Sequence, residues 1–140
     1  MSARFFLDTN IFVYSFDLTA PKKTERATEL IRLALRSGNG IISYQVVQEF
    51  FNVALRRFAQ PMAWHEAEQY LATIFRPLIA VHSSAALYAE ALRFSSQYGL
   101  SWYDSLILTS AMQSESEVLY SEDLQHGQRF GELHVENPFL

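Results

Sequence analysis

Short apolar runs alternate with longer amphipathic segments along the chain, and this alternation constrains the fold more than any other feature. The runs have the length and composition of buried strands, which we predict over residues 4–7, 41–43, 78–81, 118–120 and 134–136. Between them, apolar residues recur three and four positions apart, as on one face of a helix. We predict helices over residues 22–37, 44–58, 61–76, 84–98 and 102–112. The alternation indicates an α/β domain with a central parallel sheet flanked by helices.

The length and composition fit one globular domain. We assign residues 1–140 to a single domain, because the chain has a typical domain length and shows no internal repeat, low-complexity tract or linker. It contains no cysteine, which excludes disulfides, thiolate nucleophiles and cysteine-ligated metal centres. The N-terminus has no signal-peptide pattern, and no apolar run approaches the ~20 residues of a membrane helix. We therefore expect a cytoplasmic protein that does not associate with membranes.

Four acidic residues follow the predicted strands or open the helices that come after them. Asp8 and Asp123 stand just beyond strands, and Glu49 and Asp104 stand on early helical turns. In a parallel sheet these places share one edge, beyond the carboxyl ends of the strands, where binding sites form in such folds. Each residue also has an ordinary structural interpretation as a turn residue, a helix cap or the solvated flank of a helix. Glu122 competes with Asp123 for the last place.

Carboxylates that converge in this way need a positive partner. Two unit charges ~4 Å apart repel by about 4 kcal/mol at an effective dielectric constant of 20. The acids could share protons, pair with basic side chains or hold a metal ion. The only lysines, Lys22 and Lys23, are adjacent, and Arg57 or Arg129 could pair with one acid but hardly with all. Ligands that are all oxygen atoms select hard cations, so Mg²⁺ or Mn²⁺ would suit the cluster.

Four segments of the chain, taken together, resemble the motifs of PIN-domain ribonucleases and, among these, the VapC-like toxins of toxin–antitoxin systems. They are FFLDTNIFVYSFD, SYQVVQEFFNVALRRF, WYDSLILTSAM and LYSEDLQHG, and the similarity runs from about residue 4 to residue 139. The resemblance implies a three-layer fold with a parallel sheet in strand order 3-2-1-4-5. It also implies an acidic quartet that binds Mg²⁺ or Mn²⁺, namely Asp8, Glu49, Asp104 and Asp123.

The resemblance also bears on the polar residues beside the quartet. The family often has Ser or Thr two residues before the last acid, and Ser121 matches this position, which favours Asp123 over Glu122. Asn10 matches a frequently polar position near the site. The segment SEDLQHG departs from the commoner form Thr-x-Asp-x-Asp-Phe, so the fourth acid has the weakest support from the motif.

The implied activity is metal-assisted hydrolysis of RNA, leaving a 5′-phosphate and a 3′-hydroxyl. Asp8, Asp104 and Asp123 would hold the metal ion, while Glu49 would bind a second metal ion or orient or deprotonate the attacking water. Whether one or two metal ions bind stays open. As in VapC-like proteins, the resemblance implies a small VapB-like antitoxin and a homodimer. Helices around residues 30–35, 50–58 and 64–75 are apolar enough to offer a groove for a partner helix.

RNA approaching an acidic site needs basic side chains nearby. The formal net charge is −4, but with four of the fifteen acids set aside, eleven acids remain against eleven lysines and arginines. Local basic patches are therefore compatible with the composition. The candidate contacts are Lys22, Lys23, Arg26, Arg56 and Arg57, each of which could equally be a solvated surface residue. Trp102 and Tyr103 could stack on an unpaired base or pack in the core.

Other functions remain as alternatives. A phosphotransfer enzyme or receiver-like module would need a lysine after a later strand, or a second acid at the place of Asn10, and the chain has neither. A nuclease with a non-toxin role or a DNA or structured-RNA substrate is a closer alternative. A non-catalytic PIN module that binds RNA or protein is less expected, because such modules lose members of the quartet.

Overall fold

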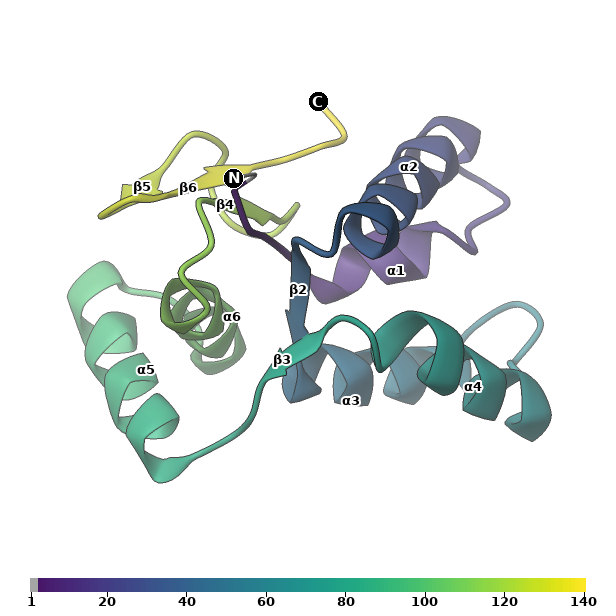
Figure 1. Ribbon diagram of the computed structural model, residues 1–140, viewed down its shortest axis with the longest axis horizontal. Helices are drawn as coiled ribbons and strands as arrows, with labels where there is room; N and C mark the ends of the chain where they lie inside the picture. Colours follow the sequence, from purple (N-terminus) through teal and green to yellow (C-terminus); the bar gives the residue numbers. More distant parts are fainter. Residues whose placement is uncertain (1–2) are drawn as a thin grey trace.

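Within residues 3–140, which the computed structural model describes, six strands form one sheet in the order β3-β2-β1-β4-β6-β5 (Figure 1). The strands are β1 (Phe5–Leu7), β2 (Gly40–Ser43), β3 (Ile79–Val81), β4 (Val118–Tyr120), β5 (Arg129–Phe130) and β6 (Leu133–Glu136). Neighbours from β3 to β6 pair in parallel, and β5 pairs antiparallel with β6. The predicted parallel sheet is confirmed, with β6 in the fifth place. The order differs from the predicted one only by β5, a short strand added at the edge.

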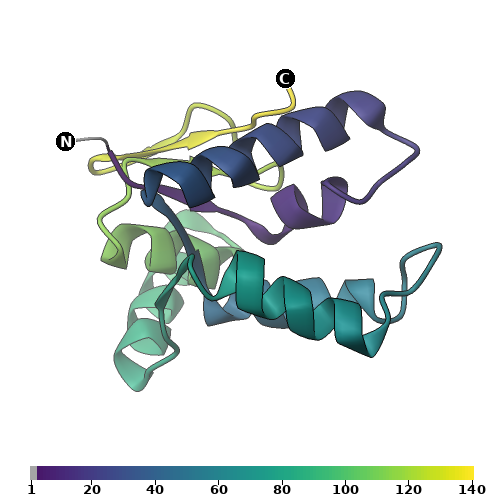
Figure 2. The same ribbon diagram turned by 45° about the vertical axis from the view of Figure 1, so that its right-hand side comes forward.

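Helices cover both faces of the sheet, so the domain has three layers. They are α1 (Thr9–Tyr14), α2 (Pro21–Ser37), α3 (Tyr44–Ala54), α4 (Trp64–Tyr70), the π-helical turn η1 (Leu71–Phe75), α5 (Ala85–Tyr98) and α6 (Trp102–Gln113). Figures 1 and 2 show α2 on one face of the sheet and the α5–α6 pair on the opposite face. No helix within residues 3–140 combines the length and the apolar character that crossing a membrane requires.

Local sequence sets the ends of these elements. Pro21 occupies the first turn of α2, where its missing N–H is not needed, and Gly38 ends that helix with a φ of 73°. Ser84 caps α5 by accepting a hydrogen bond from the N–H of Leu87 at 3.0 Å. Every residue of β1 is buried, which is typical of a central parallel strand covered on both faces.

A close contact between α2 and β2 depends on a glycine. A Cβ atom added to Gly40 would lie 2.1 Å from the Cβ of Ala34 on α2. The helix therefore lies closer to the start of β2 than any side chain would allow. This contact holds one helical layer against the first residue of β2, the strand that leads into α3.

An aromatic cluster packs α1 against α3 next to the end of β1. The rings of Phe12 on α1, Phe50 on α3 and Phe75 on η1 are fully buried. Their centroids lie 5.0 Å apart for Phe12 and Phe75 and 5.2 Å apart for Phe50 and Phe75, in edge-to-face arrangements. The cluster thereby sets the position of α3 relative to the end of β1.

Besides the added strand β5, the structure differs from the predicted elements at three helices. Helix α1 was not predicted, because six residues are too few to show a helical period. Helix α3 ends at Ala54 rather than near Phe58. Helix α4 begins at Trp64 rather than at Pro61, since Met62 uses its N–H to bind the carbonyl of Ala54 at 2.9 Å and thus folds the connection back on α3.

Candidate active site

A cleft of about 300 Å³ opens beyond the carboxyl ends of β1 and β4, between α3 and α6. All four acids of the predicted quartet line it, although they come from four separate segments of the chain. The other lining residues are two polar side chains from α1 and three apolar ones from α1, α3 and α6. The full lining consists of Asp8, Thr9, Asn10, Val13, Glu49, Val53, Asp104, Ile107 and Asp123.

Asp8 lies deepest among the four acids. It directly follows β1, caps α1 and is only 4% exposed. Its Oδ1 accepts a hydrogen bond from the N–H of Thr9 at 2.7 Å, and its Oδ2 accepts one from the hydroxyl of Ser121 at 2.8 Å. Burial raises the pKa of Asp8 to about 7; the bonds from Ser121 and Thr9 lower it, and the charges of Asp123 and Glu49 raise it further. Burial in the fold therefore disfavours the charged form of this group relative to an exposed aspartate.

Glu49 reaches the cleft from the middle of α3. Its Oε1 accepts a hydrogen bond from the hydroxyl of Thr9 at 2.7 Å. Thr9 is buried and thus ties the end of β1 to α3 through its side chain, while its N–H binds Asp8. Thr9 was not among the site residues predicted from the sequence. Its place directly after Asp8 was the available signal.

Asp104 lies in the first turn of α6. The hydroxyl of Ser101 caps this helix by accepting a hydrogen bond from the N–H of Asp104 at 3.2 Å. Ser101 and Asp104 have the spacing of a capping box, but only half of it forms, because within residues 3–140 no hydrogen bond reaches the Asp104 carboxylate. The carboxylate thus lines the cleft without a protein donor, near a helix N-terminus whose dipole favours negative charge.

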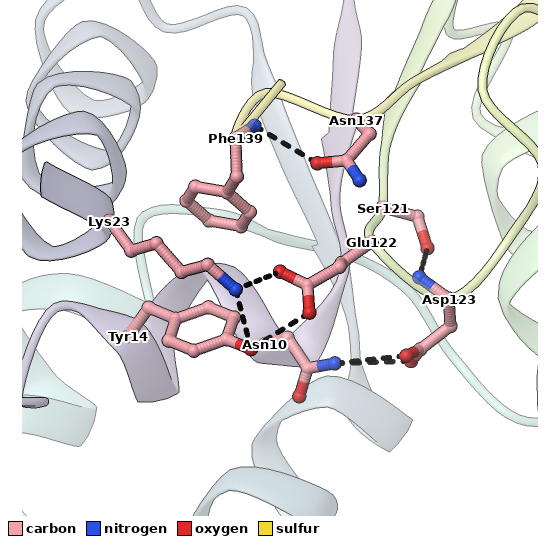
Figure 3. Close-up of polar contacts among 8 residues, drawn as sticks. All are labelled: Asn10, Tyr14, Lys23, Ser121, Glu122, Asp123, Asn137 and Phe139. Atoms are coloured by element: carbon pink, nitrogen blue, oxygen red, sulfur yellow. Dashed lines mark hydrogen bonds and ion pairs between the residues drawn. The ribbon is translucent and has the colours of Figure 1, made fainter. Parts of the chain in front are cut away.

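Asp123 follows β4 and is held by two polar neighbours (Figure 3). The amide of Asn10 donates to its two carboxylate oxygens, at 3.1 and 3.2 Å, and the hydroxyl of Ser121 accepts from its N–H at 3.2 Å. Partial burial, followed by the charges of Asp104 and Glu122, raises the pKa of Asp123. Asn10 and Ser121 thus contact the quartet directly, and Ser121 touches both Asp8 and Asp123.

Glu122, the sequence alternative to Asp123, is directed elsewhere. Its carboxylate pairs with the ammonium group of Lys23 at 3.0 Å and accepts a hydrogen bond from the hydroxyl of Tyr14 at 2.8 Å (Figure 3). It does not line the cleft. Neighbouring acids therefore have opposite surroundings, since Glu122 has a cationic partner and Asp123 has other carboxylates.

The predicted RNA-contacting residues lie outside the cleft lining. Arg56 and Arg57 are exposed just beyond the end of α3, and Lys22 is exposed at the start of α2. Lys23 is engaged with Glu122, and Arg26 pairs with Glu29 on its own helix. Across the described part of the chain, no ion pair reaches any of the four acids of the cleft.

The donor set has the chemistry of a hard-cation site. The polar side chains that line the cleft offer carboxylate, amide and hydroxyl oxygens, the ligands that Mg²⁺ and Mn²⁺ prefer. Between residues 3 and 140, however, no three acidic or histidine side chains already stand in a metal-ligating arrangement. Mutual repulsion and the hydrogen bonds from Thr9, Ser121 and Asn10 hold the carboxylates in their separate places.

Comparison with known proteins gives a family and a set of similar folds. The family model of the PIN domain matches residues 5–129. No curated protein matches significantly in sequence. A toxin–antitoxin complex from Klebsiella pneumoniae superposes with a TM-score of 0.67 at 18% identity, covering 98% of both chains. VapC20 of Mycobacterium tuberculosis, a toxin that cleaves the sarcin–ricin loop, gives a TM-score of 0.64 at 18% identity over 85% of this chain and 89% of that one. VapBC2 of Rickettsia felis, bound to promoter DNA, gives 0.61 at 20% identity over 94% and 96%.

Proposed function

The chain belongs to the PIN-domain family, and from this premise we propose that it is an Mg²⁺- or Mn²⁺-dependent endoribonuclease that acts as the toxin of a toxin–antitoxin pair. One observation carries the proposal. Four carboxylates from four segments line a single cleft, and no basic side chain within residues 3–140 forms an ion pair with any of them. Such a cluster is expected where a divalent cation, rather than a lysine or arginine, offsets the charge.

Asp8, Asp104 and Asp123 are the residues that would hold the cation, with Glu49 as a fourth ligand or a ligand of a second metal ion. The cation, when bound, lowers the pKa of a water molecule and offsets charge on the phosphate oxygens. It also makes the ionised form of Asp8 favourable at neutral pH, which burial in the metal-free fold opposes. This coupling explains why such a deeply buried aspartate can be retained.

The surrounding side chains orient these acids. Because Thr9 donates to Oε1 of Glu49, the carboxylate is held with Oε2 available to accept a proton from the attacking water. Ser121 donates to Asp8 and accepts from the N–H of Asp123, so it sets the distance between them. Asn10 holds Asp123 by donating to both of its carboxylate oxygens, and beside a bound cation its amide would also be placed to contact water or phosphate.

The substrate must bring phosphates to an acidic cleft, which requires basic residues at its margin. Arg56 and Arg57 follow α3, whose Glu49 and Val53 line the cleft, and both arginines are exposed without an ion-pair partner among the described residues. They are the best placed of the predicted contacts. Lys22 is a more distant candidate, while Lys23 would first have to leave Glu122.

The toxin role draws on the similar structures and on exposed apolar surface. The Klebsiella pneumoniae and Rickettsia felis structures are toxin–antitoxin assemblies, which supports a small VapB-like antitoxin as the partner of this chain. A surface hollow lined by Phe16, Phe58, Met62 and three other residues, with Trp64 76% exposed nearby in the chain, offers apolar surface that an antitoxin helix would cover. We also infer a cytoplasmic homodimer.

Paired substitutions of neighbouring acids test the activity. Labelled single-stranded RNA is incubated with wild type, Asp123→Asn and Glu122→Gln in Mg²⁺, in Mn²⁺ and in EDTA, with single-stranded DNA of the same sequence alongside. We expect cation-dependent cleavage of RNA that Asp123→Asn lowers by more than roughly 100-fold, beyond the usual effect of losing an outer hydrogen-bonding partner at a metal site. Glu122→Gln should cleave like wild type, because Glu122 faces Lys23. Cleavage in EDTA, or equal loss in both variants, would contradict the mechanism, and preferred cleavage of DNA would contradict the substrate.

The toxin role has a separate test. Induction in a bacterial host should arrest growth, and co-expression of a short reading frame encoded just upstream should restore it and copurify with this chain. Normal growth despite accumulation of active nuclease would show that the protein is a PIN nuclease with another role.

A further inference from the structure

A second cavity, separate from the acidic cleft, also adjoins α3 and α6. It has a volume of about 230 Å³, and its walls come from the β2–α3 junction, the end of β3, α5 and α6. It shares no lining residue with the acidic cleft, but three pairs of consecutive residues divide between them, two of which include an acid of the cleft. Gln48 and Tyr103 line this cavity, whereas Glu49 and Asp104 line the cleft. The two cavities therefore adjoin the same segments of α3 and α6.

Three residues that line the cavity carry buried polar atoms without hydrogen-bond partners within residues 3–140. Among the described residues, three buried side-chain atoms have no hydrogen-bond partner, and all three belong to residues that line this cavity: Ser43 Oγ, Gln45 Oε1 and Ser110 Oγ. These residues are 2%, 9% and 1% exposed, respectively. Folded proteins seldom leave buried polar groups unpaired, because the desolvation penalty is then not recovered. Three such atoms in one cavity indicate a place for a polar ligand.

Aromatic side chains form the rim. Tyr44 and His82 pack edge to face with centroids 4.5 Å apart, and Tyr88 lies 5.7 Å from Trp102. Tyr103, beside Asp104, is 60% exposed. Flat rings around a polar floor are the combination with which proteins bind unpaired bases, through stacking and hydrogen bonds to the base edge.

We propose that this cavity binds one unpaired nucleobase of the substrate RNA, next to the position of cleavage, and selects bases that carry an exocyclic amino group. The proposal rests on the nuclease function proposed above for the identity of the ligand. The cavity is smaller than the roughly 300–1,000 Å³ of pockets for drug-sized ligands, which suits a single planar ring system. Because consecutive residues line the two cavities, the captured base belongs to a nucleotide close to the one that is cleaved.

The selectivity follows from the orientation of Gln45. Its Nε2 donates a hydrogen bond to the backbone carbonyl of Tyr103 at 3.2 Å, and a carbonyl only accepts, so the amide orientation is fixed. Oε1 is therefore an obligate acceptor. Adenine, cytosine and guanine offer amino donors to it, whereas uracil presents a carbonyl oxygen in the corresponding place. The hydroxyls of Ser43 and Ser110 adapt to either partner. Because solvent does not reach the three atoms, a base contacts them only after side chains that line the cavity shift.

The binding test does not depend on cleavage. The chain has two tryptophans, and Trp64 is 76% exposed, so Trp64→Phe leaves Trp102 at the cavity rim as the only tryptophan. In EDTA, this protein is titrated with hexamers of adenylate, cytidylate and uridylate while tryptophan emission is followed. We expect saturable quenching by the adenylate and cytidylate hexamers and roughly tenfold weaker binding of the uridylate hexamer, the effect of one lost hydrogen bond to a buried group.

Two substitutions on α6 separate the cavity from general damage. Ser110→Ala removes one unpaired hydroxyl and should weaken binding of the adenylate hexamer roughly fivefold without lowering thermal stability. Ser105→Ala is the matched control, because Ser105 is equally buried on the same helix but donates to the carbonyl of Ser101 at 2.8 Å. It should lower stability and leave binding unchanged. Gln45→Met should bring the three hexamers to similar affinity.

The outcomes distinguish this proposal from the nuclease proposal. Selective quenching in a protein that cleaves no RNA would support the cavity and overturn the nuclease. Metal-dependent cleavage without quenching, or equal quenching by all three hexamers, would overturn the base selectivity. If Trp102 emission changes with protein concentration in the absence of RNA, a second copy of the chain covers the cavity and the proposal fails.

Discussion

Replacement of Asp8 by asparagine should stabilise the metal-free protein at neutral and alkaline pH while abolishing cleavage. The carboxyl is 4% exposed, and its pKa in the fold is about 7 against an ordinary value of 3.8. The folded state thus binds this proton more tightly than the unfolded chain. The contribution of this carboxyl to the free energy of unfolding is fully present below pH 4, and it is lost as pH rises toward 7 and beyond.

The magnitude follows from the difference between the two pKa values. About three pH units at 1.36 kcal/mol per unit amount to about 4 kcal/mol at pH 8. Asparagine does not titrate, and its Oδ1 can accept from the N–H of Thr9, but its amide can donate to Ser121 only by displacing one of the two backbone N–H groups from which that hydroxyl already accepts. With some loss of hydrogen-bond quality, we expect Asp8→Asn to gain about 2–4 kcal/mol at pH 8 and little at pH 4.

Urea denaturation of both proteins in EDTA at several pH values between 4 and 8 measures this gain. Addition of Mg²⁺ at pH 8 should then stabilise wild type and not Asp8→Asn, because a ligand that binds only the folded state raises its stability. Wild-type stability that stays flat from pH 4 to 8, or a variant that is less stable than wild type at pH 8, would refute the argument from burial.

Three further changes test the fold and the RNA contacts. Gly40→Ala should destabilise the protein by about 1–3 kcal/mol in denaturant titrations, because the added Cβ would lie 2.1 Å from that of Ala34; unchanged stability would show that α2 shifts at no cost. Ser101→Ala should lower stability by about 1 kcal/mol and also reduce cleavage, since it uncaps the helix turn that bears an acid of the cleft; intact activity with the expected loss of stability would uncouple the two. The double variant with Arg56→Gln and Arg57→Gln should keep its melting temperature, and the slope of log affinity for RNA against log salt should fall by about 1.4, so an unchanged slope would remove both as phosphate contacts.

Much of the fold follows from local patterns. Apolar runs of three or four residues and helical stripes between them predicted β1 to β4, β6 and the helices α2, α5 and α6 close to their observed positions. The elements missed are α1 and β5, which have six and two residues and so carry almost no periodic signal. The predicted start of α4 was wrong for a tertiary reason. Met62 donates a hydrogen bond to the end of α3 and therefore lies outside the helix.

The sequence by itself determined that acids would gather at one edge of a sheet, because parallel strands bring their carboxyl ends together whatever the side chains do. Only the tertiary structure decided which acid faces the cleft and which turns away. Asp123 and Glu122 are adjacent, and the contacts from Asn10 on one side and from Lys23 on the other come from residues about a hundred positions earlier. The three unpaired atoms of the second cavity likewise come from β2, α3 and α6. Local spacing fixes where a residue stands along its element, whereas the direction and partners of its side chain depend on packing between distant segments.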